Sequence, residues 1–130
     1  MPDERPFDLD LSRQAWTEAL ELTNGLPAAV PDRAEVDRLT GRLRGPVELL
    51  TAELEAVVEA QLEDSSDRET ARWLLIRTRR VLDEGQGPNH RTAAVHVEDL
   101  ALSCRALSTL RHQLATRNAR AGRRLLSRIS

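Results

Sequence analysis

Aliphatic residues recur every three or four positions between residues 36 and 57, and this spacing constrains the fold more than any other feature. A period near 3.6 residues places such side chains on one face of an α-helix. The register continues through Gly45-Pro46, although proline removes a backbone hydrogen bond and clashes with the preceding turn. The pattern predicts a long helix with a kink or break near Gly45-Pro46, whose two halves share one buried face. The apolar positions are Val36, Leu39, Leu43, Val47, Leu50, Leu54 and Val57.

Three further segments show helical spacing of apolar residues. The first covers residues 12–23, with Ser12 as its predicted N-cap. Another covers residues 67–84 and stops at Gly85, and the last begins near Thr92. Their predicted inner faces are Trp16, Ala19, Leu20 and Thr23 in the first, Ala71, Leu74, Leu75, Thr78, Val81 and Leu82 in the next, and Val97, Leu100, Cys104, Leu107 and Leu114 in the last.

These segments predict an all-α fold, a mostly antiparallel four-helix bundle with a long C-terminal helix. The near absence of aromatic residues supports this, because Leu, Val and Ala must supply the core and suit helix interfaces. At 1.5 Å per residue the segment 67–84 is too short to cover its neighbours, so we expect the first helix to pack beside residues 32–44. We predict one domain over residues 1–130, with 1–11 flexible and 115–130 forming a basic helical extension.

The chain carries no sign of a membrane span or a leader peptide. No stretch approaches the roughly 18 to 20 consecutive apolar residues that a spanning helix needs. The N-terminal residues are acidic and contain no apolar run. The single cysteine cannot form an internal disulfide. We therefore expect a cytoplasmic protein.

Three carboxylates lie on one predicted helix face and could in principle serve acid–base chemistry or bind a metal. They are Glu48, Glu55 and Glu59, at i, i+7 and i+11. A charged stripe is more typical of the outer face of a bundle, and we favour that interpretation. Bundles that bind two metal ions use Glu-x-x-His pairs, and this sequence has none.

His90, His96 and Asp99 are close in sequence, but no metal-ligand spacing accompanies them. We expect His96 at the surface or its boundary, and His112 as a partner for helix carbonyls or Arg111. Cys104 falls on an apolar stripe, which predicts a buried thiol rather than a nucleophile. Nucleophilic triads and phosphate-binding loops are also missing from the sequence. We expect no catalytic residue, metal or cofactor, and no small-molecule ligand can be inferred.

The last nineteen residues carry five arginines and no carboxylate. Residues 1–99 carry a net charge of -9 and residues 100–130 a net charge of +7, so the molecule is electrically polarised. On a helical wheel the arginines occupy an arc of about 140°. Ala115, Ala121, Leu125, Leu126 and Ile129 lie on the opposite side. The predicted contact residues are Arg117, Arg120, Arg123, Arg124 and Arg128.

Three interpretations of this basic segment remain open. The guanidinium groups could pair with carboxylates of the first two helices, and they also suit a helix C-terminus. They could contact the phosphates of a nucleic acid, although lysine, aromatic stacking residues and a helix-turn-helix signature are lacking. They could bind an anionic membrane, although the apolar side of the segment has no Trp or Phe, or they could bind an acidic partner protein or a second copy of this chain. We favour a non-catalytic interaction or accessory protein that acts through a protein partner or as a homodimer, with nucleic-acid binding as the alternative.

Two stretches, "RTRRVLDEGQGP" at 77–88 and "VEDLALSCRALSTLRHQL" at 97–114, resemble a group of short actinobacterial proteins named as natural-product biosynthesis proteins. With the helix around "LRGPVELLTAELEAVV", the resemblance covers about residues 36–114. It implies an accessory protein or ligand carrier in natural-product biosynthesis, and it implies no catalytic residues. From the residues alone, Arg79 with Asp83 and Arg80 with Glu84 form i, i+4 pairs that would support the end of their helix.

Overall fold

Four α-helices and no strand make up the part of the chain that the computed structural model describes. The backbone is described for residues 7–61 and 66–129, and side chains for all of these except 61, 118 and 121–129. The helices are α1 (Leu9–Leu22), α2 (Arg33–Gln61), α3 (Ser66–Glu84) and α4 (His90–Ile129). The predicted all-α bundle with a long C-terminal helix is confirmed.

Two helices begin earlier than the sequence pattern predicted, because a residue upstream caps each of them. The Oδ1 atom of Asp8 accepts a hydrogen bond from the backbone N–H of Leu11 at 3.0 Å, so α1 starts at Leu9. Residues 9–11, expected to be flexible, form the first turn of α1, whereas residues 1–6 lie outside the described residues. Asn89 accepts at Oδ1 from the N–H of Thr92 at 2.9 Å, so α4 starts at His90.

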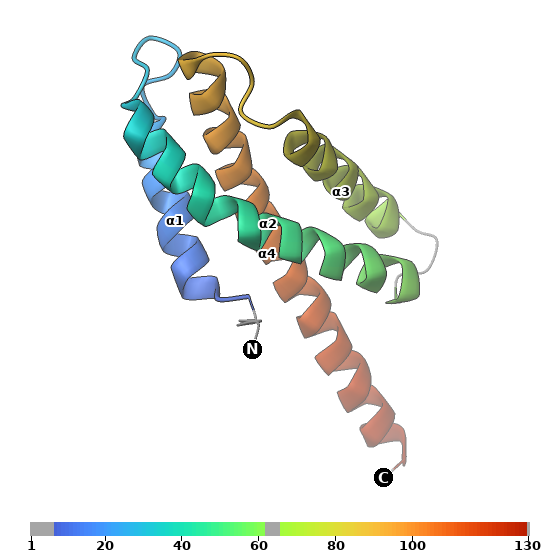
Figure 1. Ribbon diagram of the computed structural model, residues 1–130. Coiled ribbons are helices and arrows are strands. Elements are labelled where there is room, and N and C mark those ends of the chain that lie inside the picture. The colour runs from blue at the N-terminus through green and yellow to red at the C-terminus, as the bar shows by residue number, and fades with distance from the viewer. Residues whose placement is uncertain (1–6, 62–65, 130) are drawn as a thin grey trace, which may run out of the picture.

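The helices α2 and α4 cross at the centre, and the other two pack on either side of them (Figure 1). Within the described residues, α1 contacts α2 and α4 but does not contact α3. It lies beside the first half of α2, as predicted. Glu18 of α1 pairs there with Arg38 at 3.0 Å and with Arg42 at 3.5 Å.

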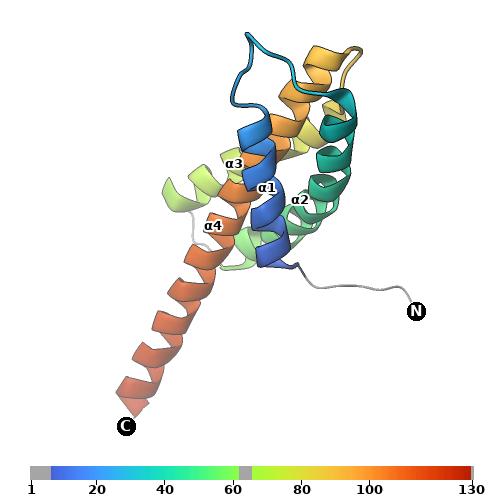
Figure 2. The ribbon, with the colours of Figure 1, turned by 90° about the vertical axis from the view of Figure 1, so that its left-hand side faces the viewer.

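Pro46 lies inside α2, which remains one continuous helix from Arg33 to Gln61. The helix bends in its middle, as two perpendicular views show (Figures 1 and 2). Its two halves share one buried face, as the spacing predicted. The one departure is near the end of the helix, where Val58 is buried and Val57 is only half-buried.

The core consists of the aliphatic stripes of all four helices, together with Trp16. Nearly every residue predicted for the inner faces is buried, and Leu20 and Leu74 are partly buried. Small residues of α4, among them Ala93, Ala94 and Ala101, are also fully buried, and their short side chains let the neighbouring helices approach α4 closely. In the described part of the chain no helix is long and apolar enough to cross a membrane.

Candidate functional site

The C-terminal part of α4 extends away from the rest of the bundle (Figures 1 and 2). A helix of 40 residues is about 60 Å long, whereas the 19 residues of α3 span about 28 Å. Arg117 and Arg120 are exposed on this extension. The side chains of Arg123, Arg124 and Arg128 lie outside the described residues, although their backbone continues the helix.

Arg117 marks the point where α4 leaves the bundle. Its Nη2 atom lies 3.0 Å from Oδ2 of Asp67, in the first turn of α3. One of the three interpretations of the basic segment pairs it with carboxylates of the first two helices, whereas this ion pair joins it to α3. One turn and a half earlier, Arg111 pairs with Glu53 of α2 at 3.0 Å and lies over the ring of Phe7. The contacts of α4 with the bundle thus extend to Arg117.

The carboxylates of α2 are neutralised by arginines on the outer surface. Glu48 pairs with Arg44 within α2. Glu59 accepts from Arg68 and Arg72 of α3. These arginines, with Arg72 making the largest contribution, lower the pKa of Glu59 to about 2. The interpretation of this stripe as a solvated outer face is confirmed.

Glu55 also pairs with α3, through Arg79. This pair replaces the predicted i, i+4 pair between Arg79 and Asp83. The predicted pair between Arg80 and Glu84 does not form among the described residues, and Arg80 is exposed. Two neighbouring arginines of α3 therefore differ in role, because one faces α2 and the other faces solvent.

His96 is buried, which corrects the expectation that it lies at the surface or its boundary. Its side chain is on the inner face of α4, with 5% exposure, and its Nε2 atom has no hydrogen-bond partner among the described residues. Burial lowers the pKa of His96, Arg44 lowers it further, and Glu84 opposes the shift. His112 is exposed and His90 opens α4 beside the carbonyl of Pro31.

No group of three or more His, Cys, Asp or Glu side chains in the described ranges is placed to hold a metal ion. Cys104 is a free, fully buried thiol, as its position on the apolar stripe predicted. Burial raises its pKa to about 12. A thiol with this pKa is a poor nucleophile, because the thiolate is the reactive form.

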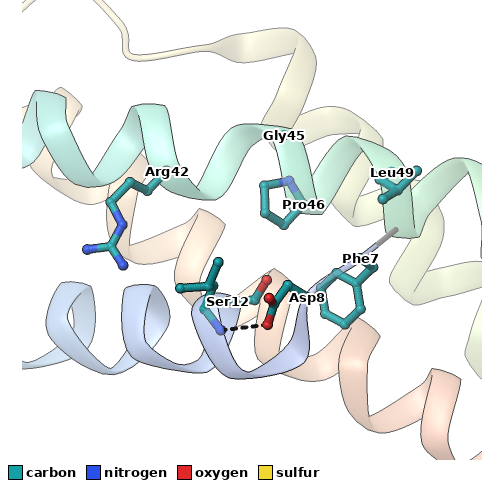
Figure 3. A pocket seen from close by; sticks show the side chains of 8 residues that line it. Phe7, Asp8, Ser12, Arg42, Gly45, Pro46 and Leu49 are labelled. Carbon is teal, nitrogen blue, oxygen red and sulfur yellow. Dashed lines mark hydrogen bonds between the residues drawn. The ribbon is translucent and has the colours of Figure 1, made fainter. Parts of the chain in front are cut away.

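An open hollow of about 410 Å³ lies where α1 begins and α2 bends. Arg42 and Pro46 of α2 face Ser12 of α1 and its N-cap residue Asp8 across it (Figure 3). Phe7, Leu11 and Leu49 supply most of the remaining lining, so the surface is largely apolar. The proline that bends α2 therefore also shapes one wall of this hollow.

Sequence reasoning missed the outward face of α3. Trp73 is 69% exposed and Ile76 is 58% exposed, although both are large apolar residues. Glu69 and Arg80 lie on the same face. The signal was present, since a helical wheel of residues 66–84 places these four positions opposite Ala71, Leu75, Thr78 and Leu82.

Residues 14–126 match the model of a family of unknown function, DUF6415, and the chain belongs to that family. The match includes all of α2 and α3 and most of α1 and α4. No curated protein and no solved structure matches the chain.

Proposed function

We propose that this protein is a non-catalytic, cytoplasmic interaction protein and that the extended end of α4 binds an acidic partner protein. The single observation that carries the proposal is the continuation of α4 beyond Arg117 to Ile129, where none of the other described helices lies beside it (Figures 1 and 2). A solitary amphipathic helix leaves its apolar side to water unless another molecule covers it.

The charge of the segment selects the kind of partner. Residues 100–130 carry seven arginines and no acidic residue. Two such segments side by side would repel each other, whereas an acidic helix could cover the apolar side and pair with the arginines. Arginine also suits such contacts because its planar group binds carboxylates through two hydrogen bonds.

The chemistry of the bundle supports a role without catalysis. Its carboxylate stripe is paired with arginines, its one thiol is buried, and its buried imidazole is on the inner face of α4. None of these groups combines exposure with a neighbouring acid, base or nucleophile in the way that general acid–base or covalent catalysis requires.

Affinity capture from a lysate of the source cells tests the proposal. The bait is the full chain, compared with a variant in which all five arginines of the segment become Glu and a matched variant in which they become Lys. We expect to capture a protein even after nuclease treatment. The unaltered chain should retain it, the Lys variant should retain it more weakly because lysine keeps the charge without the paired hydrogen bonds, and the Glu variant should lose it. Equal capture by the Glu variant would contradict the proposal.

The alternative is binding to nucleic acid through the same arginines. Contacts with five phosphates would make the logarithm of the binding constant fall with the logarithm of salt concentration, with a slope of up to about -4.5. A labelled 20-base-pair duplex measures this slope by fluorescence anisotropy. Tight binding with such a slope, lost in the Glu variant, would favour the alternative over a protein partner.

The resemblance to natural-product biosynthesis proteins suggests a further alternative, an accessory protein or ligand carrier. A groove of about 240 Å³ between α3 and α4 favours it, because polar groups of Asp67, Thr70 and Gln113 line the groove beside Leu74 and Leu110. Mass spectrometry of the native protein from its source cells tests this idea, and a copurifying small molecule is the expected result.

A further inference from the structure

The outward face of α3 carries four exposed residues in one narrow stripe. At 100° per residue, Glu69, Trp73, Ile76 and Arg80 fall within an arc of about 60°. This arc lies opposite the buried positions of the helix. α3 is at the edge of the molecule, with α2 and α4 on its inner side only (Figures 1 and 2). Nothing in the described part of the chain covers the stripe.

The exposure of Trp73 stands out because the chain has only three aromatic residues. Trp16 is buried in the core and Phe7 is half-buried, whereas Trp73 is the most exposed large apolar residue described. Tryptophan and arginine are enriched among the residues that dominate binding energy at protein interfaces. An exposed Trp-Ile pair one turn apart is a natural centre for such an interface.

The two charged ends of the stripe, Glu69 and Arg80, have no ion-pair partner within the part of the chain that the structure describes. Among the described residues, neither Glu69 nor Arg80 forms an ion pair, although α3 uses Arg68, Arg72 and Arg79 to bind carboxylates of α2. The order along the stripe is acid, tryptophan, isoleucine, base, and the outer two positions are of opposite charge. When a second copy of the stripe runs in the opposite direction, acid therefore lies opposite base and apolar residue lies opposite apolar residue.

We propose that this stripe is the contact surface for a second copy of the chain, joined through a two-fold axis that sets the two α3 helices antiparallel. With the axis between positions 74 and 75, Trp73 of each copy faces Ile76 of the other. Glu69 of each copy then faces Arg80 of the other, so both ends of the stripe are matched at once. Self-complementarity of this kind is what a two-fold interface requires.

Other arrangements of this stripe against a partner leave at least one of its charged residues facing a like charge. A parallel pairing would place Glu69 against Glu69 and Arg80 against Arg80, and like charges directly opposite are unfavourable. A partner of single-sign charge would neutralise one end of the stripe and repel the other. The stripe therefore favours a second copy over a uniformly acidic protein.

The contact is small, and this sets the strength expected of it. One helix face on each side falls below the roughly 1,600 Å² that a standard stable interface buries. We expect a weak dimer, with a dissociation constant between about 1 μM and 1 mM. This inference deepens the proposed function, since it rests on the protein acting through contacts with other chains, but it uses a surface remote from the basic segment.

Charge exchange tests the pairing. Sedimentation velocity over a concentration series gives the dissociation constant of the full chain and of the variants Glu69→Arg, Arg80→Glu and the double variant. We expect each single variant to weaken the dimer about tenfold, because it creates two like-charge contacts. The double variant should restore the affinity. Both substitutions disfavour the dipole of α3, so an effect on the folding of the monomer cannot mimic the restoration.

The apolar centre has its own test. Trp73→Ala should weaken the dimer at least tenfold, whereas Leu11→Ala, which removes an apolar side chain that is also exposed, should not. The emission of Trp73 should also move to shorter wavelength as the dimer forms.

A strict monomer up to about 1 mM, or a dimer that the double variant fails to restore, would overturn the proposal. The five-arginine Glu variant separates this result from the proposed function: it should lose the acidic partner and keep the dimer.

Discussion

The guanidinium group of Arg44 in α2 donates a hydrogen bond to the backbone carbonyl of Leu82 in α3, with Nη2 3.4 Å from the oxygen. This carbonyl belongs to the last turn of α3, where carbonyl groups have no partner within the helix and carry partial negative charge. The same guanidinium opposes the protonation of His96 in α4. Arg44 therefore both caps α3 and influences the ionisation of a buried group on α4.

Stability should depend on pH through His96. Burial lowers its pKa from the usual 6.5, so the unfolded chain binds a proton at higher pH than the folded chain does. The stability that neutral His96 provides is present above about pH 6.5 and is lost as the pH falls through the lower pKa of the folded state. We expect the free energy of unfolding, measured with urea, to decrease from pH 7.5 to pH 5.

A matched pair of variants isolates this contribution. His96→Leu should flatten the decrease between pH 7.5 and pH 5, because the titrating group is gone. His112→Leu makes the same change at an exposed site and should leave the profile as it was. Asp99, whose pKa burial raises, remains in both variants and does not affect the comparison. Identical profiles for the two variants would exclude His96 as the source.

The thiol of Cys104 should react only when the bundle opens. It is fully buried and its pKa is about 12, so both access and thiolate formation are suppressed. We expect Ellman's reagent to label it at least about a hundredfold more slowly than a free thiol, and at the free rate in denaturant. The substitution Thr109→Cys, at an exposed site and in a Cys104→Ser background, should give a thiol that labels rapidly. Fast labelling of both would contradict the burial of Cys104.

Spacing alone predicted most of the fold, because burial in a helical bundle follows the 3.6-residue period. The stripes of α2, α3 and α4 were readable for this reason, and the register through Pro46 correctly indicated one bent face. The starts of α1 and α4 were misplaced because Asp8 and Asn89 cap them, and several polar residues near each start could have done so. Capping depends on side-chain geometry that spacing does not specify.

The candidate surfaces were predicted less well, because they depend on which helices meet. Arg79 could pair with Asp83 one turn away, but the approach of α2 brings Glu55 within reach instead. His96 is one position before Val97 of the stripe, and it is buried where Arg44 of α2 and Glu84 of α3 are near enough to influence its pKa. The spacing places Trp73 and Ile76 on one face of α3, but apolar spacing alone does not tell whether another helix covers that face.

Two adjacent leucines of α2 should differ strongly in their contribution to stability. Leu50 is fully buried, whereas Leu49 is 43% exposed at the apolar hollow. Leu50→Ala leaves a cavity and should lower the free energy of unfolding by about 2 to 5 kcal/mol. Leu49→Ala should cost less than about 1 kcal/mol. Chemical denaturation of both variants measures the difference, and equal costs would show that the face of α2 is misassigned.

One substitution should have opposite effects at two glycines. Gly85 follows α3 with φ of +66°, and its N–H donates to the carbonyl of Val81 at 3.3 Å, so it ends the helix in a left-handed conformation. Gly85→Ala meets no neighbouring atom, yet it should destabilise the protein by about 1 kcal/mol because alanine disfavours that conformation.

Gly41 lies in α2, is exposed and also has open space around its Cα. Gly41→Ala should stabilise the protein by about 0.5 to 1 kcal/mol, since alanine favours the helix. Thermal unfolding of the two variants should therefore shift in opposite directions, and a shift of the same sign in both would contradict the conformation assigned to Gly85.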